Sequence, residues 1–325
     1  MLGGTRYFGR SIVQELLDQG HNVTVFTRGN NRPSILQKVN HIKGDRQDLS
    51  SFRKIFKEKT FDILIDNIGY LPNDIEATLD IFRGNIGLYI YTSSISAYRD
   101  QYLNSDILKE DDFHPIPGAI TSLQSVDDYC VGKNQCEIRL MENDEIPYVI
   151  LRPPLVMGPD DHSLNLYFFL QRIMDGGPIL LPESARLNLR HIYEKDLASA
   201  YPKFFENKSC WNRAYNIAGK EVLSAQEYLG YIANKIGKEL DIIYFSQSKL
   251  DEIEYIQPLE LNRFNENLQV FLDITRIQND IGIQLTPFKD WMDKTTDWYL
   301  NIFSGSDSKG YHKRQEEINL GKANQ

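Results

Sequence analysis

The chain has few cysteines, few histidines and no long apolar segment, and each shortage excludes a class of protein. Its 325 residues include three cysteines and six histidines. They form no Cys-x-x-Cys pair and no His-Glu-x-x-His spacing, so we predict neither a disulfide framework nor a bound metal. No window approaches about 18 consecutive apolar residues, and no charged-then-apolar leader opens the chain. We therefore predict no membrane span, no secretory signal and a cytoplasmic protein.

Positive charge is also scarce. The chain has 36 Lys and Arg against 45 Asp and Glu, which gives a formal net charge of −9. Proteins that coat nucleic-acid phosphates are usually basic, so this balance disfavours general nucleic-acid binding. A content of 41% hydrophobic and 25% charged residues is ordinary for a folded protein and excludes a disordered chain.

Short apolar runs alternate with helical patterns through the first half of the chain. The runs lie at residues 23–26, 63–65, 88–91 and 148–151. Strands that are buried on both faces of a parallel sheet have this nearly continuous apolar character. Between them, apolar residues recur at helical spacing, as at Ile12, Val13, Leu16 and Leu17. We therefore predict an α/β fold with a doubly wound parallel sheet of the Rossmann type.

A glycine-rich loop opens the chain and leads into the first helix. Glycine lets the backbone turn tightly and approach a pyrophosphate, and a helix N-terminus offers free N–H groups to the anion. We predict that this loop binds a dinucleotide through Gly3, Thr5, Arg6, Tyr7, Phe8 and Gly9. Arg6 stands where such loops usually carry glycine, and it either lies over the adenosine side or reaches a phosphate.

Only Met1 and Leu2 precede this loop. A dinucleotide fold needs a first strand of about five residues at this place, and that strand is central in the sheet. The sequence thus indicates a truncated first strand. We expect a chain extended upstream by several apolar residues to have a higher melting temperature.

The turn after the run at 23–26 bears on the choice of cofactor. NAD sites usually place an acidic residue there to bind the ribose hydroxyls. This chain has no acid at that turn and carries Arg28. A guanidinium suits the 2′-phosphate of NADP, so the sequence favours NADP over NAD. The alternative is that Arg28 is a plain surface residue.

Two later turns add cofactor candidates. Asp45 and Arg46 follow the presumed third strand, and Asp45 could accept a hydrogen bond from the adenine amino group. Asn67 and Gly69 follow the run at 63–65, at the mouth where the link between ribose and nicotinamide would lie. Of this second pair, we predict Gly69 as a cofactor-binding residue.

Three side chains form a candidate catalytic group. Tyr129 and Lys133 have i, i+4 spacing, which places a phenol and an ammonium on one face of a helix. The neighbouring cation favours phenolate and suits Tyr129 to general acid/base work. Ser94 ends a Thr-Ser-Ser run after the strand at 88–91, at the edge where open α/β sheets bind ligands.

Together these motifs resemble the extended short-chain dehydrogenase/reductase family, in its NAD-dependent epimerase/dehydratase group. The resemblance covers nearly the whole chain, and the Gly-Gly-Thr-Arg opening is similar to the atypical branch that contains chloroplast stem-loop RNA-binding proteins. It rests on residues 3–9, 44–46, 91–98, 129–133, 151–159, 196–198 and 215–217.

The resemblance implies a Ser-Tyr-Lys site that acts on a sugar-like carbinol, plausibly of a nucleotide sugar. Tyr129 would take the hydroxyl proton, Lys133 would lower the pKa of Tyr129 and bind the nicotinamide ribose, and Ser94 would hold the substrate oxygen. Hydride would pass to the nicotinamide and leave a transient ketone. Ile95 and Ser96 follow Ser94, where the family's dehydratases carry an Asp-Glu pair, so dehydratase activity is disfavoured.

The residue pattern also predicts a division of the chain. Residues 1–160 would form the NAD(P)-binding domain, with its sheet completed by parts of 186–220. Residues 161–303 would form mainly a smaller, mostly helical substrate lobe, and 304–325 a mobile polar tail. Arg190 either faces a substrate diphosphate or is a solvated charge.

Several alternatives remain open from the sequence. The enzyme is either an epimerase, with no net redox change, or a simple reductase. A protein that keeps the fold without the chemistry would bind RNA or sense a dinucleotide. The helix Tyr129–Met141 carries Ile138, Leu140 and Met141, which either contact a second copy in a homodimer or belong to the core.

Overall fold

The computed structural model of the chain describes residues 1–104, 107–118, 120–183, 188–255 and 271–323. The chain divides into two compact units. Unit 1 contains residues 1–156, 194–218 and 272–284, and unit 2 contains residues 157–193, 219–271 and 285–325.

Unit 1 is built on parallel strands that are short and apolar. Strand β1 (Thr24–Thr27) pairs with β2 (Asn40–Lys43). A second group has the order β3-β4-β6-β11, and its members are β3 (Phe61–Asp66), β4 (Ile86–Thr92), β6 (Tyr148–Arg152) and β11 (Arg213–Asn216). Every pair is parallel. Strand β6 is buried along its whole length, which explains its continuous apolar sequence.

Leu2 joins the two groups of strands. It bridges Phe26 of β1 and Asp66 of β3, and its N–H donates to the Ile65 carbonyl at 2.8 Å. The strand order is therefore β2-β1-Leu2-β3-β4-β6-β11. This is the order of a doubly wound sheet, and the predicted fold class is confirmed. The glycine loop that follows Leu2 lies between the carboxyl ends of β1 and β3, at the point where the strand order reverses.

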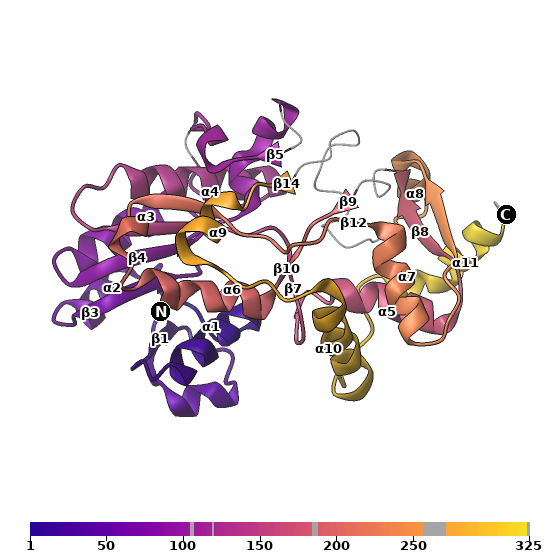
Figure 1. Cartoon of the computed structure of the whole chain (residues 1–325), viewed down its shortest axis with the longest axis horizontal. Helices are drawn as coiled ribbons and strands as arrows, with labels where there is room; N and C mark the ends of the chain where they lie inside the picture. The colour runs from indigo at the N-terminus through magenta and orange to yellow at the C-terminus, as the bar shows by residue number, and fades with distance from the viewer. Residues whose placement is uncertain (105–106, 119, 184–187, 256–270, 324–325) are drawn as a thin grey trace. The chain divides into compact units, whose positions relative to one another are not determined.

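Helices pack in two groups in unit 1 (Figure 1). Helix α1 (Tyr7–Asp18) packs against α6 (Glu194–Ala200). Helices α2 (Leu49–Phe56), α3 (Pro72–Phe82) and α4 (Val126–Met141) pack in sequence, α2 on α3 and α3 on α4. Within the described ranges, no helix is both long and apolar enough to cross a membrane.

Four phenylalanines hold α2 and α3 on the sheet. Phe26 of β1 lies with its ring centroid 5.1 Å from that of Phe52 and 5.3 Å from that of Phe56. The rings of Phe56 and Phe82 are 5.0 Å apart. Such aromatic pairs contribute about 0.5–1.5 kcal/mol beyond the burial of their area. This packing fixes the helices that follow β2 and β3, and with them the turns that leave these strands at the carboxyl edge of the sheet.

Unit 2 is mainly helical, as the sequence indicated for this part of the chain, and it also contains strands that were not predicted. Its helices are α5 (Asn165–Asp175), α7 (Ala225–Lys235), α8 (Gln247–Glu252), α10 (Phe288–Asn301) and α11 (Arg314–Lys322). Strand β8 (Ile179–Pro182) pairs in parallel with β13 (Ile242–Phe245), and β9 (Asn188–Leu189) pairs with β12 (Leu223–Ser224).

Short elements complete the chain. They are α9 (Thr275–Ile281), β5 (Ile107–Leu108), β7 (Val156–Met157), β10 (Ile192–Tyr193), β14 (Phe271–Leu272), and 3₁₀ helices at Ser34–Lys38, Ile95–Asn104, Glu110–Asp112, Tyr201–Phe204, Lys208–Cys210 and Tyr311–Lys313.

Two expectations about the C-terminal part need correction. Of the residues 304–325 predicted as a mobile polar tail, Arg314–Lys322 form α11, whose Glu317 makes a buried ion pair with Arg172 of α5 at 2.6 Å, and 324–325 lie outside the described residues. This pair joins positions far apart in the chain, so composition alone could not reveal it. Residues 272–284, predicted in the substrate lobe, belong to unit 1 because Arg276 donates to the Ala214 carbonyl of β11 at 3.3 Å.

Candidate active site at the carboxyl edge of the sheet

The glycine loop forms a cradle with the N-terminus of α1. Gly3 and Gly4 have φ angles of +88° and +98°, which other residues rarely adopt. A Cβ on Gly9 would lie 3.1 Å from the Gly4 Cα, so α1 approaches the loop closely. No side chain caps the first turn of α1, and that turn carries no acidic residue. Its N–H groups and positive dipole end therefore suit an anion.

The other predicted loop residues divide between the surface and the core. Thr5 is half-buried, and Phe8 packs edge-to-face on Tyr7 with ring centroids 5.8 Å apart. The Tyr7 hydroxyl donates to the Val156 carbonyl at 2.7 Å, so this side chain supports the fold. Arg6 is exposed, and its guanidinium donates to the Asn31 side chain at 3.5 Å. Arg6 therefore extends toward the turn after β1.

Arg28 lies in a basic stretch at the carboxyl ends of β1 and β2. It is exposed and directly follows β1. Residues 26–44 contain four cations, Arg28, Arg32, Lys38 and Lys43, and no acidic residue. The Lys43 side chain lies 3.1 Å from a Cβ built on Gly29, next to Arg28. In a chain with a net charge of −9, this stretch is locally positive and suits a phosphate.

Asp45 and Arg46 have different surroundings. Asp45 is exposed and accepts a hydrogen bond from the Gln47 N–H at 3.0 Å. Arg46 is buried, and its Nη1 donates to both carboxylate oxygens of Asp66 at 3.0 Å. Its Nη2 donates to the Asp74 carbonyl at 2.7 Å and to the Thr78 hydroxyl at 2.8 Å. The guanidinium is thus held by the fold, and a cofactor role for Arg46 stays a prediction.

The structure brings Lys133 to the ends of β3 and β4. Lys133 is 2% exposed, and its Nζ donates to the Gly69 carbonyl at 2.9 Å and to the Thr92 carbonyl at 2.8 Å. Gly69 follows β3, and Thr92 is the last residue of β4. Burial lowers the pKa of Lys133 to about 8. An ammonium has three N–H groups, so one remains for a ligand or for Tyr129.

Three tyrosine rings surround this ammonium. Lys133 Nζ lies 4.8 Å from the ring centroid of Tyr91, 4.9 Å from that of Tyr70 and 6.0 Å from that of Tyr129. A Cβ on Gly132 would lie 2.4 Å from the Tyr70 carbonyl oxygen, so α4 packs directly on the Tyr70 backbone. Tyr70 was not predicted as a site residue. The predicted pair Tyr129 and Lys133 does share one face of α4.

Ser94 lies two residues beyond the Thr92 carbonyl that Lys133 contacts. It is buried, and its Oγ accepts a hydrogen bond from the Ser96 N–H at 3.1 Å. Ser94 therefore sits at the turn from β4 into the 3₁₀ helix Ile95–Asn104. The structure thus places Ser94, Lys133 and Tyr129 at one strand end, while contact of all three with a single substrate oxygen stays a prediction.

Asn67 is a polar residue at this edge that the sequence located without assigning it a role. Its Oδ1 accepts a hydrogen bond from the Thr92 hydroxyl. Its Nδ2 is buried and has no hydrogen-bond partner in the structure. A Cβ on Gly9 would lie 3.5 Å from this nitrogen. The glycine cradle and the unsatisfied donor beside it fit a dinucleotide phosphate.

Ser93, the residue directly after β4, belongs to a different network. Ser93 donates to Glu137 of α4, and Arg152 of β6 donates to the same carboxylate through Nε at 2.9 Å and Nη2 at 2.6 Å. Arg152 also donates to the Tyr98 hydroxyl at 2.7 Å. Glu137 and Arg152 are both fully buried. Arg152 is therefore a structural residue.

Arg190 belongs to unit 2 and has a backbone partner there. Its Nε donates to the Gly219 carbonyl at 2.7 Å. A Cβ on Gly219 would lie 2.5 Å from the His191 carbonyl oxygen, so the two segments lie in close contact. This contact positions the guanidinium, and its role toward a substrate diphosphate stays a prediction.

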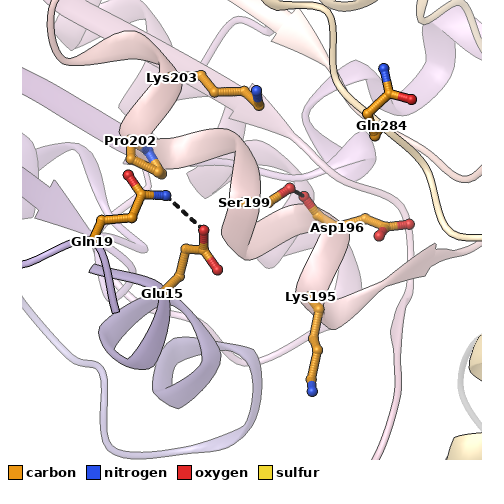
Figure 2. A pocket seen from close by; sticks show the side chains of 8 residues that line it. All are labelled: Glu15, Gln19, Lys195, Asp196, Ser199, Pro202, Lys203 and Gln284. Atoms are coloured by element: carbon orange, nitrogen blue, oxygen red, sulfur yellow. Dashed lines mark hydrogen bonds between the residues drawn. The ribbon is translucent and has the colours of Figure 1, made fainter. Parts of the chain in front are cut away.

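A hollow of about 630 Å³ lies elsewhere on unit 1, over α1 and α6 (Figure 2). It is lined by Glu15, Gln19, Lys195, Asp196, Ser199, Pro202, Lys203 and Gln284. Its lining includes two lysines and two carboxylates, and Gln19 donates to Glu15 at 2.7 Å. It contains none of the predicted site residues. The hollow is therefore separate from the carboxyl edge of the sheet.

Comparison with known proteins gives one family match and one curated relative. Residues 1–104 match the sequence profile of the NAD dependent epimerase/dehydratase family. The chloroplast stem-loop binding protein of 41 kDa b from Arabidopsis thaliana is 26% identical over 268 residues. That alignment covers 77% of this chain and 66% of the relative, just under two thirds of its length.

Solved structures share the fold. The UDP-glucose 4-epimerase of Thermotoga maritima, solved with UDP-glucose, superposes with a TM-score of 0.73 at 15% identity over 92% of this chain and 97% of that one. The UDP-glucuronic acid 4-epimerase of Bacillus cereus, solved with NAD, gives 0.69 at 17% identity over 93% and 98%. At such identities the likeness establishes the architecture alone.

Proposed function

Because residues 1–104 match the sequence profile of the NAD dependent epimerase/dehydratase family, we propose that the chain is an NAD(P)-dependent epimerase or oxidoreductase that acts on a sugar-like carbinol. The observation that carries the proposal is the placement of Lys133. Its buried ammonium is fixed by the ends of β3 and β4 and lies 6.0 Å from the Tyr129 ring centroid. A nucleotide sugar is the proposed substrate, by analogy with the neighbours' UDP-sugar substrates.

In this proposal Tyr129 is the general base. A substrate hydroxyl donates its proton to the phenolate, and the Lys133 charge favours that form of the phenol. With a pKa of about 8, Lys133 is protonated at neutral pH and can supply this charge. Ser94 donates a hydrogen bond to the same substrate oxygen. When bound, the nicotinamide supplies the hydride acceptor for the carbinol carbon.

The cofactor is assigned to the glycine loop and the basic stretch after β1. Gly3, Gly9 and the N-terminus of α1 would hold the pyrophosphate, and Lys133 would bind the nicotinamide ribose. Arg28, exposed and without an acidic residue from 26 to 44, would bind the 2′-phosphate of NADP. We therefore favour NADP over NAD.

Chemistry at the neighbouring carbon separates the reaction classes. Ile95 and Ser96 follow Ser94 and are buried, so this turn offers no carboxyl group for water elimination. An epimerase reduces the ketone again on its other face, whereas a simple oxidoreductase releases the ketone together with NADPH or, in the reverse direction, releases the alcohol and consumes NADPH. The first gives no net change in NADPH and the second gives a stoichiometric change. A homodimer through the helix that carries Tyr129 remains a prediction.

An assay with NADP⁺ and a panel of nucleotide sugars tests the proposal. We expect the wild type to form product. Tyr129→Phe removes the acid/base group, and we expect it to lower the rate by at least about a hundredfold. Absorbance at the NADPH band separates reductase from epimerase. Tyr231→Phe, which removes a phenol from α7 in unit 2, is the matched control and should react as the wild type does. Equal rates for wild type and Tyr129→Phe would contradict the proposed mechanism.

The curated relative supports a second candidate function. Its name describes stem-loop binding, and the basic stretch at 26–44 offers a local phosphate-binding surface. In that case the fold would bind RNA without turning over a cofactor. Retention of a stem-loop RNA on a filter, lost as salt is raised, would favour this function. Absence of retention at low salt would exclude it.

A further inference from the structure

Asn67 points its amide at the glycine loop. It directly follows β3, and its N–H donates to the Leu2 carbonyl at 3.1 Å, which fixes its backbone beside the loop. A Cβ on Gly3 would lie 3.5 Å from the Asn67 Cβ, and a Cβ on Gly9 would lie 3.5 Å from Nδ2. The side chain thus lies between the two glycines that shape the cradle.

The two ends of this amide face different neighbours in the structure. Asn67 Oδ1 accepts from the Thr92 hydroxyl, and that hydroxyl is 2.6 Å from the Tyr201 hydroxyl. The carbonyl end therefore faces β4, and the nitrogen faces the loop. There Nδ2 is buried without an acceptor in the structure. An unsatisfied buried donor costs about 1–3 kcal/mol, and few occur in native proteins.

The groups around this nitrogen define what can satisfy it. The first turn of α1 presents N–H groups without a side-chain cap and without an acidic residue. Asn67 Nδ2 adds two more N–H donors on the strand side of the same cradle. A set of donors with no acceptor among them is complementary to an oxyanion.

We propose that Asn67 Nδ2 donates a hydrogen bond to a phosphate oxygen of the dinucleotide pyrophosphate. The inference rests on the proposed dinucleotide-binding function and adds a side-chain ligand to it. Asn67 thus binds the cofactor on one side, while Thr92 holds its carbonyl on the other. Because Thr92 also presents its backbone carbonyl to Lys133, one residue positions both the phosphate donor and the catalytic ammonium.

Titration calorimetry with three probes tests this role. NADP⁺ and ADP-ribose carry the pyrophosphate, whereas adenosine 2′-monophosphate lacks it. We expect Asn67→Leu to lower the binding affinity for NADP⁺ and ADP-ribose by about tenfold or more. The affinity for adenosine 2′-monophosphate should not change. Asn67→Asp keeps the acceptor for Thr92 and replaces the N–H donor with a carboxylate oxygen. It should therefore lower the affinity for NADP⁺ and ADP-ribose at least as much. If Asn67→Leu does not fold, Asn67→Asp alone tests whether the Asn67 amide binds the pyrophosphate.

Asn40→Leu is the matched control, since Asn40 begins β2 at the opposite end of the strands and its amide has a partner in Asn22 at 3.0 Å. It should bind all probes as the wild type does. If the wild type binds NADP⁺ and folded Asn67→Leu and Asn67→Asp bind it equally well, the amide holds only water and this inference is wrong. If the folded wild type binds no probe, the proposed dinucleotide function fails and the inference fails with it.

Discussion

Thr92 and Ser93 are neighbours at the end of β4, yet they belong to two kinds of polar surroundings. Ser93 faces Glu137 and Arg152, a fully buried pair in which the guanidinium and the carboxylate bond each other and nearby groups. The Thr92 hydroxyl contacts Asn67, whose buried amide nitrogen has no partner. The Thr92 backbone carbonyl accepts from Lys133, whose ammonium has one N–H to spare. Side chains alternate between the faces of an extended chain, so the hydroxyls of Thr92 and Ser93 have different neighbours, although Lys133 and Glu137 both belong to α4.

The difference teaches where function is to be sought in this molecule. A buried polar network in which every hydrogen-bonding group is paired stabilises one fold and leaves no donor or acceptor for a ligand. A buried polar group with an open position carries a free-energy cost that a ligand can relieve. The two sides of β4 should therefore respond differently to substitution, pH and ligand.

The largest expected effect is on the satisfied side. Arg152→Leu leaves the Glu137 carboxylate buried without its partner, and we expect the free energy of unfolding to fall by about 3–5 kcal/mol. Urea denaturation measures this loss. The double variant Arg152→Leu/Glu137→Leu removes both charges and should recover part of it.

A surface ion pair gives the matched control for Arg152. Arg53 and Asp80 form a pair in which both side chains are more than half exposed. Arg53→Leu should cost less than about 1 kcal/mol, because solvent screens such pairs. If Arg152→Leu lowered the free energy of unfolding as little as Arg53→Leu does, the buried network would stabilise the fold no more than a surface pair.

The second expected effect is a pH dependence of stability that Lys133 produces and Arg152 does not. Burial lowers the pKa of Lys133 to about 8, whereas Glu137 raises the pKa of Arg152. Below pH 8 both folded and unfolded chains hold the Lys133 proton, and the fold carries the cost of the buried charge. Between about pH 8 and the ordinary lysine pKa near 10.5, only the unfolded chain holds it, so this cost disappears.

Relative to Lys133→Met, the wild type should therefore gain stability as pH rises from 7 to 10, by about 3 kcal/mol at most. Urea denaturation of both proteins across this range measures the difference, in which the titration of shared groups cancels. A difference that does not change with pH would show that Lys133 is not desolvated.

Local sequence signals predicted the parts of the site that local geometry builds. The glycine loop with the start of α1 is one short stretch of sequence, and the i, i+4 pair Tyr129 and Lys133 is another, so local spacing placed each of them. Apolar runs likewise located β1, β3, β4 and β6. The strand-end rule brought Ser94 and Gly69 to the same edge of the sheet.

What the sequence could not predict depends on partners distant in the chain. The sequence placed Arg46 after the presumed third strand, but it could not show that Asp66 and Thr78 accept hydrogen bonds from its guanidinium. The open nitrogen of Asn67 is visible only once Thr92 fixes the other end of the amide. Glu317 of α11 looked like part of a polar tail until Arg172 paired with it.

The measurement that tests the account most directly is calorimetric titration of NADP⁺ and NAD⁺ into the wild type and Arg28→Ala. We predict saturable binding of NADP⁺, tighter than that of NAD⁺, and a loss of about tenfold for NADP⁺ with Arg28→Ala, which removes the guanidinium from the 2′-phosphate. NAD⁺ affinity should be the same in both proteins. No binding of either cofactor by folded protein would contradict the account and favour RNA binding.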